Sequence, residues 1–128
     1  MIQDDDYYNV VRSLWESGSK FIICEHDIIP WPGAIAEIDE CDHPWCTFWY
    51  RTGVGWLNRG LGLVKFDPSR LPNIFGAPFT ETHWRNLDIQ IGSRLHLHAL
   101  KPHIHSPPVT NLNPLMTVGL NMYPPKGQ

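Results

Sequence analysis

A short apolar run, Phe21-Ile22-Ile23-Cys24, is the feature that most constrains how this chain can fold. A continuous apolar run of this length is typical of a central strand covered on both faces, so we expect Cys24 to be buried. The run ends abruptly in the polar triplet Glu25-His26-Asp27. The flanking segments 7–16 and 34–40 carry apolar residues at helical spacing. This order of helix, strand, acidic loop and helix predicts an α/β fold.

The middle of the chain continues the alternation. Strands are predicted over 45–50 and 60–66, which are rich in aromatic and aliphatic residues. A helix capped by Thr80 or Thr82 is predicted to run to about Leu95. We therefore expect a small sheet with helices around it.

Two stretches of alternating residues follow, 95–100 and 102–105, and both indicate extended structure. The chain has 128 residues with 42% hydrophobic content, enough to bury one core without disulfides. We predict a single domain over residues 1–112 and a Pro-rich C-terminal tail over 113–128.

Composition argues against two classes of protein. The formal net charge is −3 and the basic residues are scattered, which is unlike a nucleic-acid binder. No apolar run approaches the length of a membrane span, and the N-terminus is acidic rather than a basic and then apolar leader. We expect a cytoplasmic protein with no membrane span and no nucleic-acid partner.

The acidic pair Glu25 and Asp27 follows a predicted strand, at the end where α/β sheets bind ligands. In extended backbone, side chains at i and i+2 project from one side, about 7 Å apart. Carboxylates suit Mg²⁺ or Mn²⁺, and a diphosphate can fill the remaining coordination positions. The alternative of two solvated loop acids, with His26 merely exposed, stays open.

Histidines recur near the C-terminus. His103 and His105 share the i, i+2 spacing, and one of them with Asp27 and a diphosphate would form a coherent metal site. The remaining spaced or isolated histidines are better explained as structural: His96, His98, His43 and His83.

The three cysteines, Cys24, Cys41 and Cys46, lack the spacing of a zinc framework. We interpret them as reduced thiols that pack as small core residues.

Asp88 falls on the apolar face of the predicted helix, together with Trp84, Leu87, Ile91 and Leu95. A carboxylate held there could act as a general base, because burial raises its pKa. Bonding to a helix N-terminus or to an arginine, Arg85 or Arg94, explains it equally well.

The segment Lys20-Phe21-Ile22-Ile23-Cys24-Glu25-His26-Asp27-Ile28, with the Pro-Gly, short helix and Pro44-Trp45-Cys46 that follow, resembles small family-two-like glycosyltransferases of the GT-A fold, including phage and bacterial ones. Glu25-His26-Asp27 occupies the place of that fold's Asp-x-Asp motif. The resemblance extends over roughly Tyr8 to Asn111.

Three later blocks arrive in the order that this fold requires. Gly60-Leu61-Gly62 looks like its acceptor-side glycine segment, and His83-Trp84-x-x-Leu87-Asp88 looks like its acidic helix. Pro102-His103-Ile104-His105-x-Pro-Pro looks like the segment that carries its C-terminal metal histidine.

The resemblance implies a metal-dependent glycosyltransferase that transfers a sugar from a nucleotide diphosphate sugar to an acceptor hydroxyl. It implies that Asp27 and His103 or His105 bind Mn²⁺ or Mg²⁺, that Glu25 lies nearer the ribose or sugar, and that Asp88 is the base. His26 and the glycine segment would border the nucleotide sugar. The implied fold is a partial GT-A-like, Rossmann-like sandwich with a short mixed sheet.

One departure from the family concerns the N-terminal half, which normally builds the nucleoside pocket before the acidic motif. Here a single helix precedes the first strand. A second chain could complete the pocket, the protein could be a minimal form with another binding mode, or it could have lost activity. We expect a homo-oligomer or a chain completed by a partner, because an incomplete sheet leaves an edge to cover.

Two other functions compete with this interpretation. Asp27 and the His-x-His segment could belong to a different metal-dependent hydrolase that activates water. The tryptophan-rich loops could instead belong to a non-catalytic protein for carbohydrate binding or assembly.

Overall fold

A computed structural model describes residues 5–53, 55–80 and 82–112, so the predicted tail over 113–128 lies outside the described residues. The chain forms two compact units, and each is described by itself. The first unit combines the N-terminal segment to Phe21 with Phe66–Lys101. The second combines Ile22–Lys65 with the described residues from Pro102 to Leu112. Helices and strands are mixed, as the α/β prediction requires.

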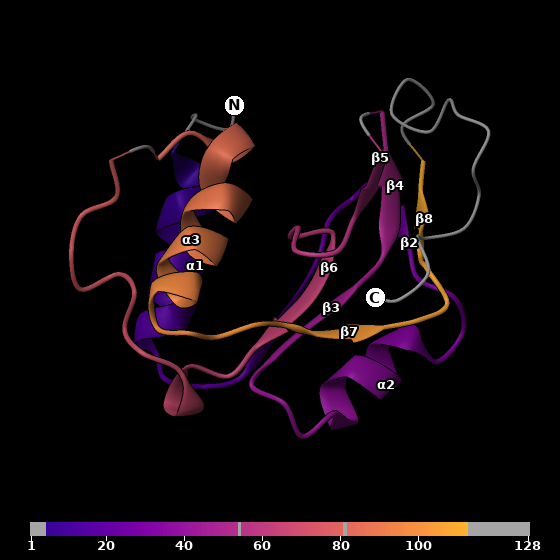
Figure 1. Ribbon diagram of the computed structural model, residues 1–128, viewed down its shortest axis with the longest axis horizontal. Helices are drawn as coiled ribbons and strands as arrows, with labels where there is room; N and C mark the ends of the chain where they lie inside the picture. Colours follow the sequence, from indigo (N-terminus) through magenta and orange to yellow (C-terminus); the bar gives the residue numbers. More distant parts are fainter. Residues whose placement is uncertain (1–4, 54, 81, 113–128) are drawn as a thin grey trace. The chain divides into compact units, whose positions relative to one another are not determined.

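The first unit is helical (Figure 1). It contains α1 (Asp6–Glu16), the 3-10 turns Pro68–Arg70 and Trp84–Asn86, and α3 (Leu87–Leu97). The prediction of α1 is confirmed. Helix α3 differs from its prediction at both ends, because it starts at Leu87 and continues through residues that alternate like a strand.

Aromatic packing forms the core of this unit. Trp15 lies 4.9 Å from the ring centre of Phe66 and 5.6 Å from that of Phe75. Tyr8 contacts Phe75 at 5.6 Å and Phe79 at 5.1 Å. Tyr8 and Trp15 are buried on one face of α1, so this face packs against the segment that carries Phe75 and Phe79.

One side chain of α3 holds the same irregular segment. The Arg94 guanidinium donates to the carbonyls of Ile74, Ala77 and Pro78, at 2.9, 2.7 and 2.5 Å. It also lies 4.2 Å from the ring centre of Phe79. The segment has little secondary structure, so Arg94 supplies partners that a helix or sheet would otherwise supply.

The predicted apolar face of α3 is confirmed for Leu87, Ile91 and Leu95, which are buried. It is wrong for Trp84, which is 49% exposed because it lies in the 3-10 turn before the helix. That turn is capped by His83, whose Nδ1 accepts a hydrogen bond from the Arg85 N–H at 3.1 Å, rather than by a threonine.

The second unit contains the main sheet apart from the strand-end residues Phe21 and Phe66, which belong to the first unit. The strand order is β1 (Phe21–Cys24), β6 (Leu63–Phe66), β3 (Trp45–Phe48) and β7 (His103–His105). Strands β3 and β7 are parallel. The prediction of β1 as a strand is confirmed, but it is an outer strand and not a central one. Cys24 is consequently exposed rather than buried.

Two small antiparallel pairs and one helix complete this unit. Strand β2 (Ile28–Ile29) pairs with β8 (Thr110–Asn111), and β4 (Tyr50–Thr52) pairs with β5 (Gly55–Leu57). Helix α2 (Ala34–Glu40) has the predicted bounds.

The core of the second unit lies between α2 and the central strands. All residues of β3 and β6 are buried. A buried cluster joins Ile38 of α2 to Cys46, Phe48 and Leu63. Lys65 is only 2% exposed, and its Nζ donates to the carbonyl of Cys41, so a cation is built into this side of the core.

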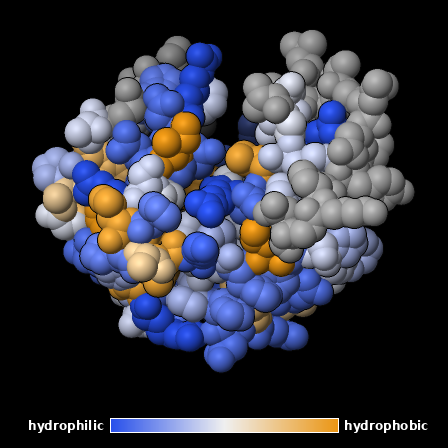
Figure 2. Space-filling model, in the orientation of Figure 1, coloured by the Kyte–Doolittle hydropathy of each residue, from blue (hydrophilic) through white to orange (hydrophobic). Residues whose placement is uncertain are grey.

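Apolar side chains are dispersed on the face of the molecule that Figure 2 draws. Figure 2 shows small apolar groups separated by hydrophilic residues on the face that it draws. Among the described residues, no helix has both the length and the apolar character needed to cross a membrane. Single exposed apolar side chains are ordinary on a protein surface.

Arg94→Ala should lower the free energy of unfolding by about 2–3 kcal/mol, because three carbonyls lose a charged donor. The matched control is Arg12→Ala on α1, whose Nε lies 3.4 Å from Glu16 Oε1 with both side chains nearly half exposed. That change should cost less than about 0.5 kcal/mol. Chemical denaturation of both variants measures the difference, and equal losses would contradict the role given to Arg94.

Candidate functional site

The acidic triplet forms a turn rather than extended backbone. The Ile28 N–H donates to the Glu25 carbonyl at 3.0 Å, which reverses the chain between β1 and β2. The expected projection of Glu25 and Asp27 from one side of a strand is therefore wrong. His26 is exposed at the tip, and both acids are half-buried.

Two backbone hydrogen bonds border this turn. The Glu25 N–H donates to the carbonyl of Gly62 at 2.8 Å, and the Leu112 N–H donates to the carbonyl of Asp27 at 2.7 Å. The turn therefore lies beside the predicted glycine segment on one side and beside the chain that follows β7 on the other. Three segments that are far apart in sequence meet here, and the third is represented by Leu112, which lies beyond the His103–His105 block.

The glycine segment Gly60-Leu61-Gly62 is buried. A Cβ on Gly60 would lie 1.9 Å from Tyr50 Oη, and one on Gly62 would lie 2.6 Å from Tyr50 Cε1. Both glycines thus have a packing reason to be glycine, because the Tyr50 ring lies against their backbone. Their role beside a nucleotide sugar stays a prediction.

Asp88 lies in the first turn of α3, in the first unit. Its Oδ1 accepts a hydrogen bond from the Ile89 N–H at 2.8 Å, as expected for an acid at a helix N-terminus. Burial raises the pKa of Asp88, and the backbone hydrogen bonds oppose that rise. The carboxyl is therefore a stronger base, when ionised, than a solvated aspartate.

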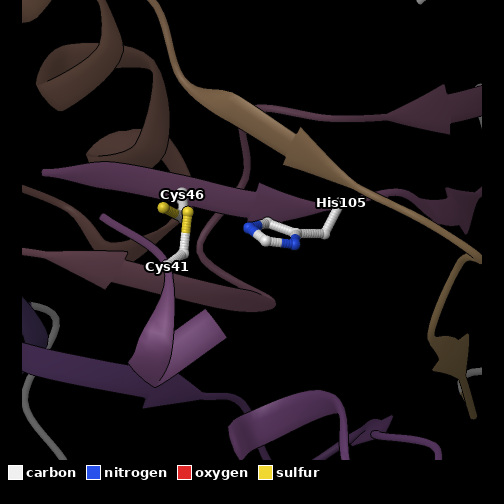
Figure 3. A group of neighbouring side chains, drawn as sticks. All are labelled: Cys41, Cys46 and His105. Carbon is white, nitrogen blue, oxygen red and sulfur yellow. The ribbon is translucent and has the colours of Figure 1, made fainter. Parts of the chain in front are cut away.

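The side chains with the most suggestive geometry are Cys41, Cys46 and His105 (Figure 3). Two thiol sulfurs and one imidazole nitrogen lie within 4.8 Å of one another. The figure shows the His105 ring extending from β7 toward the two sulfurs. Thiolate and imidazole are ligands of zinc.

The fold explains why these residues meet. In the parallel pair of β3 and β7, Cys46 is the register partner of His103, and Phe48 that of His105. Because side chains alternate along a strand, Cys46, His103 and His105 are presented to the same face of the sheet. Cys41 joins them because it directly follows α2, which covers that face.

His105 is held by a carboxylate of α2. Its Nδ1 lies 2.8 Å from Glu37 Oε2, and its side chain is only 10% exposed. The Nε2 atom is buried and has no hydrogen-bond partner among the residues that the structure describes. Such an atom is costly to leave unpaired, so its surroundings require an explanation.

Cys41 also belongs to a second group, with His43 and His103. These two rings stack at 4.2 Å between centres with 7° between their planes, and both residues are exposed. Partial burial lowers the pKa of His103, and the neighbouring His43, His105 and Lys65 lower it further. Neutral imidazole is the form that binds a metal.

The thiol of Cys46 is protonated in the absence of a metal. Burial raises its pKa to about 12, and Cys41 adds to the rise while the Lys65 cation opposes it. Its Sγ donates to the carbonyl of His43 at 3.3 Å. A metal ion would have to displace this proton.

Asp27 belongs to neither of the two groups found among the described residues. The predicted pairing of Asp27 with His103 or His105 is therefore not supported by these groups, and the histidines lie with thiols instead. The sequence interpretation missed Cys41, Cys46 and His43 as ligands because their spacing matches no standard zinc motif. The signal was present as Cys41-x4-Cys46 with His103-x-His105.

Gly62→Ala should lower the free energy of unfolding by about 1–3 kcal/mol, because its Cβ would overlap the Tyr50 ring. Gly92→Ala in α3 is the matched control, since a Cβ there meets nothing within 4 Å. That change should instead stabilise the protein by about 0.5–1 kcal/mol. Thermal unfolding of both variants distinguishes the signs, and a neutral Gly62→Ala would mean that the glycine is not there for packing.

Comparison with known proteins finds no relative: no protein-family model, no curated protein and no solved structure matches this chain.

Proposed function

We propose that this chain is a metal-dependent glycosyltransferase, or the acidic-motif part of one, that uses a nucleotide diphosphate sugar. The observation that carries the proposal is the pair of backbone hydrogen bonds at the acidic turn, from Glu25 to Gly62 and from Leu112 to Asp27. They join two of the four blocks on which the resemblance rests, the acidic triplet and the glycine segment, and they hold Leu112, which follows the histidine block, beside the same turn.

In this proposal the acidic turn binds the diphosphate end of the donor. Asp27 supplies a carboxylate ligand to the cation, and diphosphate oxygens supply most of the others, because no group of three protein ligands includes Asp27 among the described residues. A bound Mn²⁺ or Mg²⁺ neutralises charge on the leaving diphosphate. Glu25 lies nearer the ribose or sugar, and exposed His26 borders the nucleotide.

Asp88 takes the proton of the acceptor hydroxyl if the enzyme inverts configuration. The raised pKa supports this role, because a general base is more effective as its pKa approaches the working pH. The helix N-terminus orients the carboxylate through the Ile89 N–H.

Completion of the nucleoside pocket by another subunit belongs to the same proposal. The outer strands of the main sheet are β1 and β7. An outer strand offers unpaired backbone groups to a second chain.

Asp27→Ala should weaken manganese-dependent binding of nucleotide diphosphates. Calorimetric titration of uridine and guanosine diphosphates and their sugars, with and without Mn²⁺, should show binding to the wild type that weakens at least about tenfold, or about 1.4 kcal/mol, in the variant. Asp5→Ala is the matched control, because it removes an exposed carboxylate from the other unit. Equal binding by wild type and Asp27→Ala would overturn the assignment of the acidic turn.

Asp88→Asn should stabilise the fold at neutral pH and abolish sugar transfer. A carboxyl whose pKa is raised in the folded state binds more protons folded than unfolded, so stability falls as the pH rises from about 4, the ordinary value, through the raised pKa. Asparagine removes that loss and keeps an oxygen for the Ile89 N–H. Thermal midpoints should therefore separate at pH 7 and converge near pH 3; a variant that is less stable at pH 7 would contradict the burial argument.

A further inference from the structure

The cluster of Cys41, Cys46 and His105 is not used by the proposed sugar transfer. Ordinary core packing explains a buried cysteine, but it does not explain a buried imidazole that turns an unpaired nitrogen toward two sulfurs. A metal ion that binds two thiolate sulfurs and one imidazole nitrogen would give every one of these atoms a partner.

We propose that Cys41, Cys46 and His105 bind a zinc ion that ties the end of α2 to strands β3 and β7.

The separations of the donor atoms suit this ion. Zinc–sulfur and zinc–nitrogen bonds of about 2.3 and 2.0–2.1 Å place tetrahedral ligands about 3.6–3.8 Å apart. The three donor atoms already lie within 4.8 Å of one another. Each pair of donor atoms therefore needs to approach by roughly an ångström at most, a distance within the reach of small side-chain rotations.

Glu37 prepares His105 for this role. With Nδ1 2.8 Å from the Glu37 carboxylate, the proton of the neutral ring resides on Nδ1, and the Nε2 lone pair is free to bind the metal. A carboxylate that orients a ligating histidine in this way usually improves metal affinity about 10–100-fold.

The charges of the surroundings also favour the bound state. Zinc with two thiolates and a neutral imidazole carries no net charge, so the ion can be buried without a large desolvation cost. Lys65 is buried and its Nζ donates to the Cys41 carbonyl, so a cation lies next to the residues that would supply the two thiolates. Donors of this softness select zinc over the Mn²⁺ or Mg²⁺ of a diphosphate site.

The second group, Cys41 with His43 and His103, offers candidates for a fourth ligand. Cys41 is shared by the two groups, so His43 and His103 flank an ion bound through its sulfur. A histidine there would close the coordination sphere as in structural zinc sites.

Cobalt titration of the reduced full-length protein tests the proposal. We expect one Co²⁺ per chain, with a thiolate-to-metal charge-transfer band in the near ultraviolet and the intense visible bands of tetrahedral cobalt. Zinc should displace the cobalt. Cys41→Ser and Cys46→Ser should each lose most of the charge-transfer band, whereas Cys24→Ser, which removes an exposed thiol outside both groups, should keep it.

A second pair of variants tests the role of His105. His105→Gln should weaken binding, whereas His96→Gln, on an exposed position of α3, should not. Glu37→Gln should retain the tetrahedral spectrum and lose about 10–100-fold in affinity, a pattern that a merely structural glutamate would not produce.

Thiol reactivity of the wild type tests the same proposal without a variant, so the result does not depend on whether a variant folds. Zinc should protect two of the three cysteines from a disulfide reagent and leave Cys24 reactive. Absence of a charge-transfer band together with unprotected Cys41 and Cys46 would overturn the proposal. The outcome is independent of the sugar-transfer proposal, because Asp27→Ala should leave the cobalt spectrum unchanged.

Discussion

The parallel pairing of β3 with β7 is the interaction on which the rest of the second unit depends. Parallel neighbours cannot be joined by a tight turn, so a long stretch of chain must separate Phe48 from His103. That stretch contains β4 to β6 and most of the first unit. The pairing therefore joins the middle of the sequence to its C-terminal part, and it is what brings His-x-His to the side of Cys46.

The two candidate sites of this unit follow from different parts of that topology. The acidic turn is bordered by backbone contacts to Gly62 and Leu112. The cysteine and histidine cluster is instead formed by side chains on the covered face, next to Lys65. Hard oxygen donors in one place and soft donors in the other suit different ions, so the two sites need not compete for one metal.

Local patterns predicted the elements well where local forces decide them. Helices α1 and α2 were recognised from apolar spacing, and β1 from its continuous apolar run. Periodicity could not show that β1 is an outer strand, because its position depends on pairing with β6, some forty residues further along the chain. The same limit explains why Cys24 is exposed and why residues beyond Leu95 remain helical.

The candidate site was less predictable, because it is built by contacts across the sequence. His103 and His105 were identified as possible ligands from their spacing, but nothing local indicates that Cys41 and Cys46 lie beside them. The glycines at 60 and 62 were interpreted as ligand-facing, whereas the Tyr50 ring gives them a packing role. Sequence spacing identified chemistry within a segment and could not identify its neighbours from other segments.

The division into two units has a consequence for whether either unit could be separated from the other. Each unit is made of two separate stretches, so the backbone passes from one to the other three times, after Phe21, Lys65 and Lys101. No single cleavage can release both units whole. Neither unit can therefore be expressed alone as one uninterrupted segment of this chain.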